Sequence, residues 1–308
     1  MTATERGPDL VTGAFSYSGE AISRHLLARG RAVRTLTGHP ERGVESPSIE
    51  TYSLDFGDPV RLAEAMQGVD VFYNTYWVRF SRRDVNHDRA VVQSVMLFEA
   101  ARRARVQRVV HVSITNPGIE SPYSYFRAKA QVERALSDSG LPHVIVRPAI
   151  LFGGNGVLLN NIAWLLRRLP VFAIGGDGRY RVRPVHVEDL AALCVEGARR
   201  EEDGAVIDAV GPERPPFREL VEWTRAAVDS GARLVNVPAP IIPVVARALG
   251  LVLRDVLLTG DEYHAMADGL ADTDGPATGK VLLSRWLAEH GEELGRGYAN
   301  ELDRHFRP

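Results

Sequence analysis

The sequence predicts an α/β protein built on a doubly wound parallel sheet, with a smaller C-terminal α/β lobe. Two observations lead to this fold class. Short apolar runs alternate with amphipathic segments through residues 1–150, at the spacing of right-handed βαβ units. The first apolar run, Leu10-Val11, enters a turn of small residues that opens a helix near Gly19. We therefore expect a sheet domain over residues 1–150 and, over residues 151–308, a lobe interleaved with it that ends in helices.

The elements of the sheet domain follow in order from apolar runs, helix caps and glycines. Asp58 is placed to cap a helix that begins at Pro59, and Gly30 and Gly68 follow helix ends. The expected strands are residues 10–11, 31–37, 49–54, 69–74, 106–113 and 144–148. The expected helices are residues 19–27, 59–66, 85–104 and 125–139, and residues 75–84 are expected to form a loop.

The second half changes character. Residues 171–174 are expected to form a short strand, residues 182–187 an extended segment and residues 272–279 an exposed polar loop. Residues 158–169 and residues 295–306 are expected to be helical. A third helix is expected to be capped by Asp189 and to end at residue 198, and a fourth to follow Pro215 and Pro216 and end near residue 228. A fifth is expected to follow the proline-rich residues 237–243 and to end at Gly250.

Composition excludes several classes of function. The 308 residues are 45% hydrophobic and 25% charged with a formal net charge of −2, so nothing in the overall balance indicates nucleic acid or an anionic membrane as a partner. No run approaches the ~20 apolar residues that span a bilayer, and no signal-peptide core is present. The single cysteine, Cys194, lies in an apolar run and is expected to be an inert core thiol. The nine histidines show no ligand-like clustering, so we expect no metal. These observations favour a cytoplasmic protein, and a homodimer is left open.

The turn after the first strand has the chemistry of an anion site. Its spacing is Gly13-x-x-Ser16-x-x-Gly19, and it aims backbone N–H groups and the positive end of a helix at one spot, which suits a pyrophosphate. Ser16 stands where a dinucleotide-binding turn usually has its middle glycine. A strand-to-helix turn with two glycines also arises for tight packing alone, so the rest of the chain decides between these readings.

A second group that indicates function is Tyr125 and Lys129. These residues are four apart and therefore share one face of the expected helix. A neighbouring ammonium lowers the pKa of a phenol and makes it usable as a general acid or base. The pair alone also fits a solvated helix face. Its position after the fifth strand of a sheet that opens with a glycine turn favours a functional pair.

In their order along the chain, these motifs resemble the short-chain dehydrogenase/reductase superfamily, in its extended and atypical branches. The motifs are Thr12-Gly13-x-x-Ser16-x-x-Gly19, Asp55, Val69-Asp-Val-Phe, Val110-His-Val-Ser113, Tyr125-x-x-x-Lys129 and Arg147-Pro-Ala-Ile-Leu-Phe-Gly153. Residues 172–189, in particular Arg183-Pro-Val-His-Val-Glu-Asp189, resemble the NAD(P)-binding relatives of the 39 kDa accessory subunit of respiratory complex I. The similarity covers most of residues 8–230. It implies a Rossmann-type sheet that binds NAD(P) and a substrate-side lobe after residue 150.

The resemblance also implies a role for individual residues. It places one group of residues along the pyrophosphate, a second beside the adenine, a third by the ribose on the nicotinamide side and a fourth against the nicotinamide ring. These groups are Gly13, Phe15, Ser16, Tyr17 and Gly19; Asp55 and Phe56; Asn74, Thr75 and Tyr76; and Pro148 and Ile150, in that order. Tyr125 would donate the proton, and Lys129 would lower its pKa and hold the ribose. For Asp55, a carboxylate that caps the next turn is the alternative.

The region after the second strand favours NADP over NAD. The strand ends without the acidic residue that binds the 2′-hydroxyl of NAD. Thr37, His39 and Arg42 occupy the region instead, and His39 and Arg42 could pair with the 2′-phosphate of NADP. A solvated loop is the alternative for these two side chains.

One residue departs from the family pattern. In active members a Ser or Thr just past the fifth strand donates a hydrogen bond to the substrate carbonyl, and here Ile114 takes that place between Ser113 and Thr115. Either Ser113 or Thr115 substitutes after a local shift, or the protein binds cofactor without turnover. Loss of one such donor costs ~2.7–4 kcal/mol of transition-state stabilisation.

Two further groups of residues are open to more than one interpretation. Arg79, Arg82, Arg83 and His87 could clamp an anionic substrate, or they could belong to a solvated loop. His186 could face the active site, although a packed strand end is the simpler interpretation.

Two functions are therefore carried forward. The first is hydride transfer between NADP(H) and a carbonyl or alcohol of a small molecule, or epimerase or dehydratase chemistry through a keto intermediate on the same residues. The second is a non-catalytic NAD(P)-binding protein that acts as a redox sensor or structural accessory, which Ile114 favours.

Overall fold

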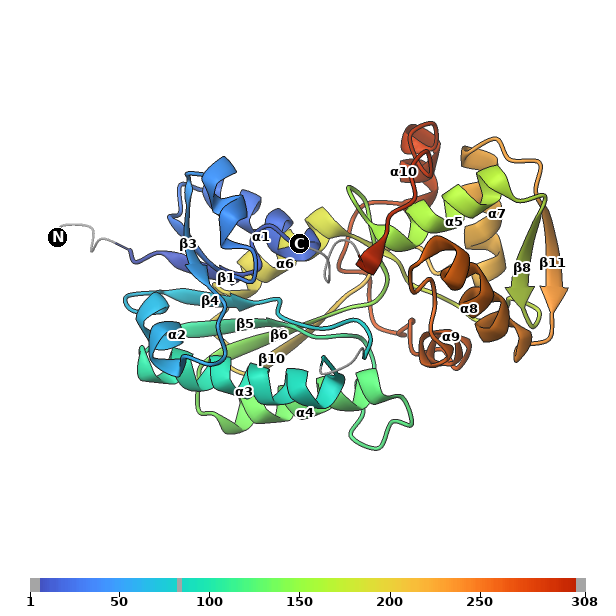
Figure 1. The fold of residues 1–308 in the computed structure, drawn as a ribbon. Coiled ribbons are helices and arrows are strands. Elements are labelled where there is room, and N and C mark those ends of the chain that lie inside the picture. Colours follow the sequence, from blue (N-terminus) through green and yellow to red (C-terminus); the bar gives the residue numbers. More distant parts are fainter. Residues whose placement is uncertain (1–5, 82–84, 303–308) are drawn as a thin grey trace. The chain divides into compact units, whose positions relative to one another are not determined.

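The computed structural model describes residues 6–81 and 85–302 and arranges the chain in two compact units (Figure 1). The first unit combines the residues up to 148 with residues 187–209. The second combines residues 149–186 with the residues from 210 onward. The chain therefore leaves the first unit after its sixth strand and returns to it for one helix and one further strand. None of the helices described is long and apolar enough to cross a bilayer.

A parallel sheet forms the centre of the first unit. Over the described residues the strand order is β10-β6-β5-β4-β1-β2-β3, and every neighbouring pair is parallel. The strands are β1 (Asp9–Thr12), β2 (Val33–Thr37), β3 (Ile49–Ser53), β4 (Val71–Asn74), β5 (Arg108–Val112), β6 (His143–Pro148) and β10 (Ala205–Ala209). The chain winds outward in one direction from β1 and in the other from β4, and doubly wound sheets bind ligands at the carboxyl ends of the strands at such a point. The predicted doubly wound parallel sheet is confirmed.

Helices cover both faces of this sheet (Figure 1). Helices α1 (Tyr17–Leu27) and α6 (Val187–Gly197) pack against each other on one face. The other face is covered by α2 (Pro59–Ala65), α3 (His87–Arg103) and α4 (Ser124–Asp138), while a short 3-10 helix, η1 (Pro40–Glu45), connects β2 to β3. The Asp58 carboxylate accepts a hydrogen bond from the Arg61 N–H, so the predicted cap of α2 is confirmed.

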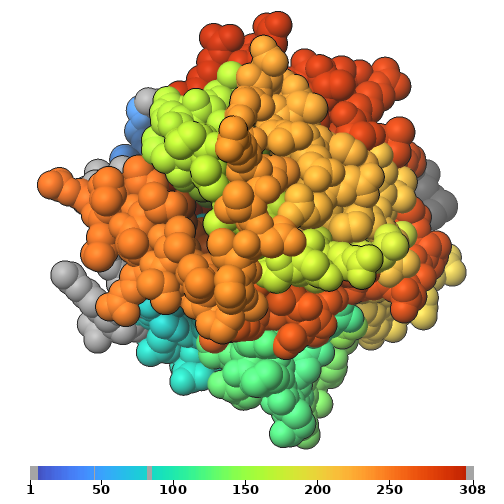
Figure 2. Space-filling model, turned by 90° about the vertical axis from the view of Figure 1, so that its right-hand side faces the viewer, coloured from blue at the N-terminus to red at the C-terminus, as the bar shows by residue number. Residues whose placement is uncertain are grey.

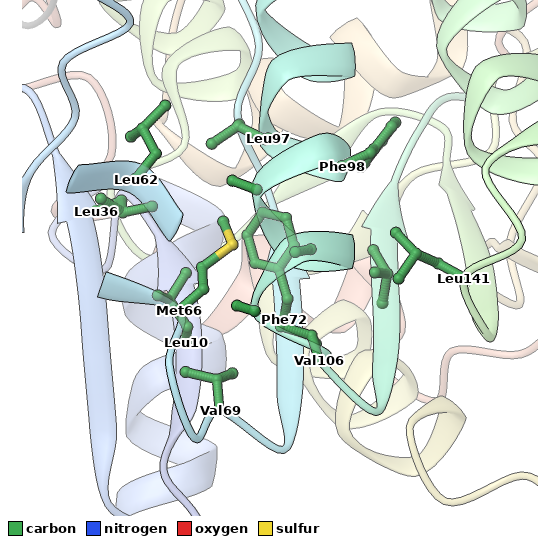
Figure 3. Close-up of a cluster of buried hydrophobic side chains, with 14 of the residues drawn as sticks. Leu10, Leu36, Leu62, Met66, Val69, Phe72, Leu97, Phe98, Val106 and Leu141 are labelled. Atoms are coloured by element: carbon green, nitrogen blue, oxygen red, sulfur yellow. The ribbon is translucent and has the colours of Figure 1, made fainter. Parts of the chain in front are cut away.

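The core between the sheet and the helices α2 and α3 is apolar and closed to solvent (Figure 3). Phe72 of β4 is fully buried, together with Leu10 of β1, Leu36 of β2 and Leu97 of α3. Strands covered on both faces are nearly continuous in apolar residues, which is why the sequence runs are so clear here. The core fixes β1 and β4 side by side, so the residues that follow these two strands also lie together.

The second unit contains two small parallel sheets and a group of helices. The strands are β7 (Leu151–Phe152) paired with β9 (Val185–His186), and β8 (Val171–Gly175) paired with β11 (Arg233–Val237). The helices are α5 (Val157–Arg168), α7 (Phe217–Ala227), α8 (Ile241–Leu253), α9 (Gly260–Ala267) and α10 (Leu283–His290). Phe152, Leu166 and Trp286 are among the residues of the buried core. The smaller α/β lobe predicted after the sheet domain is confirmed as a fold class.

Several boundaries in the second half differ from the prediction. Helix α6 begins at Val187, so Asp189 lies inside its first turn and the predicted cap is wrong. Helix α8 continues past Gly250 to Leu253, because the following Arg254 takes the left-handed conformation that ends a helix. Residues 295–300 are not helical, and the remainder of the helix expected over 295–306 lies mostly outside the described residues.

Strands β10 and β11 and helices α9 and α10 were not predicted. Strand β10 alternates buried and exposed residues, with Val206 and Asp208 on the more exposed side, so it lacks the apolar run of a central strand. It is nevertheless the strand that pairs with β6 and extends the sheet.

Candidate functional site

The glycine turn closes tightly on itself at the carboxyl end of β1. Gly13 has a φ of +63°, a conformation that favours glycine, and a side-chain carbon on Gly19 would lie 2.1 Å from the Gly13 carbonyl oxygen. The Ser16 hydroxyl donates to that same carbonyl at 2.6 Å and makes no hydrogen bond to the first turn of α1. The N–H groups at the positive end of α1 are therefore not capped by the Ser16 side chain. An anion site requires such N–H groups to be available.

Two buried threonines brace this turn. Thr35 Oγ1 accepts a hydrogen bond from the Ala14 N–H at 3.0 Å and donates to the Val11 carbonyl at 2.8 Å. Thr12 Oγ1 accepts from the Thr75 N–H at 2.8 Å. Sequence reasoning missed both bracing roles, because threonine in a strand is ordinary and the partners lie on other strands.

The Asn74 side chain, at the end of β4, contacts β5 and the residues after β4 rather than solvent. It is fully buried, its Oδ1 accepts from the Tyr76 N–H at 3.1 Å, and its Nδ2 lies 3.2 Å from Nδ1 of His111. Burial, reinforced by the charge of Lys129, lowers the pKa of His111 well below its usual range, so the imidazole is neutral. Asn74 thereby positions the backbone of Thr75 and Tyr76, two of the residues assigned to the ribose.

The residues predicted to flank the adenine lie after β3. The Asp55 carboxylate accepts from the Gly57 N–H at 2.8 Å, which is the turn-capping arrangement considered as the alternative for this residue. The Phe56 ring packs against Tyr76 with 5.1 Å between the ring centres. The structure thus brings the expected adenine and ribose groups into contact.

The region after β2 carries charges of both signs. Thr37 Oγ1 accepts from the His39 N–H at 3.1 Å, and His39 Nδ1 lies 3.2 Å from a carboxylate oxygen of Glu41. Arg42 is exposed in η1. Two basic side chains therefore stand beside the carboxyl end of β2, with one carboxylate already engaged by His39.

Lys129 is buried at the carboxyl end of β5. Its side chain is 2% exposed, its ammonium donates to the Val112 carbonyl at 2.9 Å, and its Nζ lies 4.2 Å from the centre of the Trp77 ring. Burial lowers the pKa of Lys129 to about 7, partly opposed by the carboxylate of Glu133. The Glu133 carboxylate in turn accepts hydrogen bonds from Nε and Nη2 of Arg147. The lysine therefore has a carbonyl and an aromatic face as its near partners.

Tyr125 lies one turn before Lys129 in α4, and the Trp77 ring contacts both. The Tyr125 ring meets Trp77 edge to face at 5.5 Å and His87 edge to face at 5.5 Å. Trp77 and His87 are stacked at 6.0 Å, and His87 Nδ1 lies 2.9 Å from the Ser124 hydroxyl. The sequence pattern gave no sign of Trp77 over Lys129, because Trp77 lies in a loop.

The hydroxyls on either side of Ile114 are both buried. Ser113 is 4% exposed and Thr115 is fully buried, whereas Ile114 is half-buried. The Ser113 N–H donates to the Val146 carbonyl and the Thr115 N–H to the Pro148 carbonyl, so the segment continues along β6 past the end of β5. Pro148 ends β6, and Ile150, which belongs to the second unit, accepts a hydrogen bond from the Val185 N–H at 2.8 Å.

Three buried polar atoms here lack a hydrogen-bond partner among the residues that the structure describes. They are Ser113 Oγ, Trp77 Nε1 and His111 Nε2. Buried polar groups are nearly always paired, so unpaired atoms beside a strand end indicate a place where a ligand or water completes the bonding. Together with the tight glycine turn, they fit a polar dinucleotide.

Over residues 6–81 and 85–302, the remaining candidates do not form the anion clamp considered from the sequence or a second site. His87 is buried within the aromatic group rather than exposed as a clamp, and Arg82 and Arg83 lie outside the described residues. In the second unit, the His186 ring packs on Phe152 with 5.1 Å between ring centres, as expected of a packed strand end. Burial raises the pKa of the Cys194 thiol, in keeping with the inert core thiol predicted. In the described part of the chain no three His, Cys, Asp or Glu side chains form a group that could hold a metal.

Comparisons with known proteins extend this description. Residues 13–161 match the family model described as NAD(P)H-binding. The chain is 26% identical over 264 residues to mitochondrial NADH dehydrogenase (ubiquinone) 1 alpha subcomplex subunit 9 of Arabidopsis thaliana, covering 80% of this chain and 64% of that protein. It is 27% identical over 296 residues to 4-hydroxy-2-methyl-3-oxo-4-farnesyl-3,4-dihydroquinoline-1-oxide ketoreductase of Stigmatella aurantiaca, covering 82% of this chain and 88% of that protein.

A similar fold occurs in a solved structure of an NADPH-dependent quinone oxidoreductase from Escherichia coli in complex with NADPH. The TM-score is 0.73 over 92% of this chain and 99% of that chain, at 20% identity, which shows the fold alone. The chain spans just under two thirds of the length of the first curated relatives it matches, 66% and 64%. The resemblance predicted from the motifs is confirmed: residues 13–161 form an NAD(P)-binding domain, and the relatives include subunits of mitochondrial NADH dehydrogenase.

Proposed function

We propose that this protein, whose residues 13–161 form an NAD(P)-binding domain, is an NADP(H)-dependent oxidoreductase that reduces a carbonyl group of a small molecule or oxidises the corresponding alcohol. The observation that carries the proposal is the placement of Lys129. A buried ammonium whose near partners are a carbonyl and an aromatic face is costly to keep, and such groups cluster at functional sites.

The nicotinamide of the cofactor would supply or accept the hydride. Gly13, Ser16 and Gly19 would hold the pyrophosphate at the positive end of α1, and Asp55 and Phe56 would flank the adenine.

Tyr125 would give its phenolic proton to the carbonyl oxygen as that oxygen gains negative charge. Lys129, one helical turn away and held by the Val112 carbonyl, stabilises the phenolate that remains. His87 and Trp77 pack against the Tyr125 ring and fix its orientation. Ser113 would be the third member of the site and donate a hydrogen bond to the substrate carbonyl. Its buried hydroxyl lacks a partner in the described part of the chain.

The names of two similar proteins support carbonyl reduction. One is a ketoreductase that this chain covers over most of its length, and a protein of similar fold is a quinone oxidoreductase. Epimerase or dehydratase chemistry would use the same Tyr125 and Lys129 through a keto intermediate. Turnover of a nucleotide sugar would indicate this chemistry instead of simple reduction.

A second candidate function is a non-catalytic NAD(P)-binding protein. The half-buried Ile114 between two buried hydroxyls favours it, because an isoleucine at this position cannot donate a hydrogen bond to a substrate carbonyl. Such a protein would bind NADPH with full affinity and would show no turnover.

Two experiments test the proposal. Titration with NADPH by calorimetry tests the shared premise, and Gly19→Ala should abolish binding because its methyl group would meet the Gly13 carbonyl. Consumption of NADPH with a panel of ketones and quinones then separates the candidates. Tyr125→Phe should lower turnover by roughly 10²–10⁴-fold without changing NADPH affinity. Equal turnover of parent and variant would remove Tyr125 as the acid, and binding without turnover on any panel member would favour the accessory role.

A further inference from the structure

Helix α8 carries an apolar stripe on its exposed side. The stripe consists of Ile241, Val244, Val245, Ala248, Leu251 and Val252, whose spacing of three and four residues places them on one face of the helix. Val244, Leu251 and Val252 are 66%, 76% and 80% exposed. The orange atoms of this segment lie at the surface in Figure 2. Contiguous exposed apolar surface of this kind marks an interaction site.

The opposite side of α8 accounts for its attachment to the second unit. Helix α8 packs against β8 and α9, and Ile242 and Gly250 are its buried residues. A side-chain carbon on Gly250 would lie 2.6 Å from the Asp255 carbonyl, so the helix is held closely at that point. The stripe is therefore not the face that binds α8 to its own unit.

Two exposed arginines border the stripe. Residues 230–254 contain three arginines and no Asp or Glu, and Asp255, which follows them, is buried with its carboxylate engaged by Tyr298 and two backbone N–H groups. Arg247 is exposed and lies one turn from both Val244 and Leu251, and Arg254 is exposed where the helix ends. An apolar face bordered by arginines is complementary to an apolar layer under an anionic surface.

We propose that the α8 stripe binds the surface of an anionic lipid bilayer, with its valines and leucine in the headgroup boundary and Arg247 and Arg254 on lipid phosphates. Thirteen helical residues measure about 20 Å, which is too short to span a bilayer, so the helix lies in the plane of the interface. A second copy of the chain is a poorer occupant. In a two-fold dimer the patch would meet itself, so the arginines that border it on one copy would face those of the other copy.

Sedimentation of the full-length protein with vesicles tests this proposal independently of any catalytic activity. The vesicles contain phosphatidylcholine alone or phosphatidylcholine mixed with phosphatidylglycerol. The parent should bind the phosphatidylglycerol vesicles, and raised salt should weaken this binding. Val244→Asp combined with Leu251→Asp should abolish it. Arg247→Gln and Arg254→Gln should each lower the partition coefficient about fivefold.

Val92→Asp is the matched control, because Val92 is 60% exposed on α3 of the first unit. It should bind vesicles like the parent, and unfolding curves and circular dichroism should show that all variants fold. The proposal is overturned if the parent binds neither vesicle, if it binds both equally, or if Val92→Asp loses binding as well. It is also overturned if light scattering shows a dimer that Val244→Asp dissociates while no vesicle binding occurs, since the stripe then covers a second copy.

Discussion

The ammonium of Lys129 lies 4.2 Å from the centre of the Trp77 ring, with the lysine side chain 2% exposed. A cation over an aromatic face is attracted by the ring, and the attraction is stronger when water is excluded. The price of the arrangement is desolvation of the ammonium, which brings the pKa of Lys129 down to about 7. The fold therefore holds a group at this site that changes charge near neutral pH.

This buried charge predicts a stability effect of Lys129→Met. The pKa of Lys129 is lower in the folded protein than in the unfolded chain, so between pH about 7 and pH 10.5 the unfolded chain binds more protons and the parent gains stability as pH rises. Methionine carries no proton. The variant should therefore be more stable relative to the parent at pH 6 than at pH 9, seen as a larger difference in the free energy of unfolding measured in urea.

The matched control for this experiment is Lys280→Met, which removes a lysine from the second unit. Its stability difference from the parent should change far less between the two pH values. A difference for Lys129→Met that is the same at pH 6 and pH 9 would mean that Lys129 titrates in the folded protein as it does in the unfolded chain.

Removal of the Trp77 ring should change the pH dependence of activity. Trp77→Ala opens Lys129 to water, so the pKa of Lys129 should rise from about 7 toward its usual value. If the charged lysine assists Tyr125, kcat/KM of the parent should fall as pH rises through about 7, and this fall should move to higher pH in Trp77→Ala. Trp77→Phe keeps an aromatic face over the ammonium and should retain the parent profile. Identical profiles for the alanine and phenylalanine variants would separate Trp77 from the titration.

The sequence predicted the sheet and the motifs well where the signal is local. The turn from Gly13 to Gly19 and the cap at Asp58 depend on residues a few positions apart, and both are readable as patterns. Lys129 was readable as a partner of Tyr125, but its cover by Trp77 was not, because an irregular loop brings the indole there. Strand β10 was missed for a related reason, since its pairing with β6 follows a long excursion of the chain through the second unit.

The basic residues after β2 predict a cofactor preference. If Arg42 binds the 2′-phosphate of NADP, Arg42→Glu should weaken NADPH binding by about tenfold or more, because a charge-assisted hydrogen bond is replaced by repulsion. NADH, which lacks this phosphate, should bind the variant and the parent equally. Arg102→Glu, in the last turn of α3, is the matched control and should leave both affinities unchanged. Calorimetric titration gives the dissociation constants of NADPH and NADH for the parent and for Arg42→Glu. An equal loss of affinity for NADPH and NADH would show that Arg42 does not bind the 2′-phosphate.

Ile114 gives the sharpest test of whether the site turns over substrate. An isoleucine cannot donate to a carbonyl oxygen, and one missing donor of this kind costs roughly 10²–10³-fold in kcat. Ile114→Ser should therefore raise kcat for ketone reduction, by about tenfold or more, if its hydroxyl reaches the carbonyl. Ile114→Val shortens the side chain without adding a donor and should not raise kcat.

Steady-state rates of both variants, alone and combined with Tyr125→Phe, complete the argument. A gain that Tyr125→Phe abolishes places the new hydroxyl and the phenol on the same carbonyl. A gain shared by Ile114→Val would instead reflect room made in the site. If neither variant gains while Tyr125→Phe still lowers the parent rate, the carbonyl is already held by another donor, and the buried hydroxyl of Ser113 is then the residue to change, because its partner is otherwise missing from the described part of the chain.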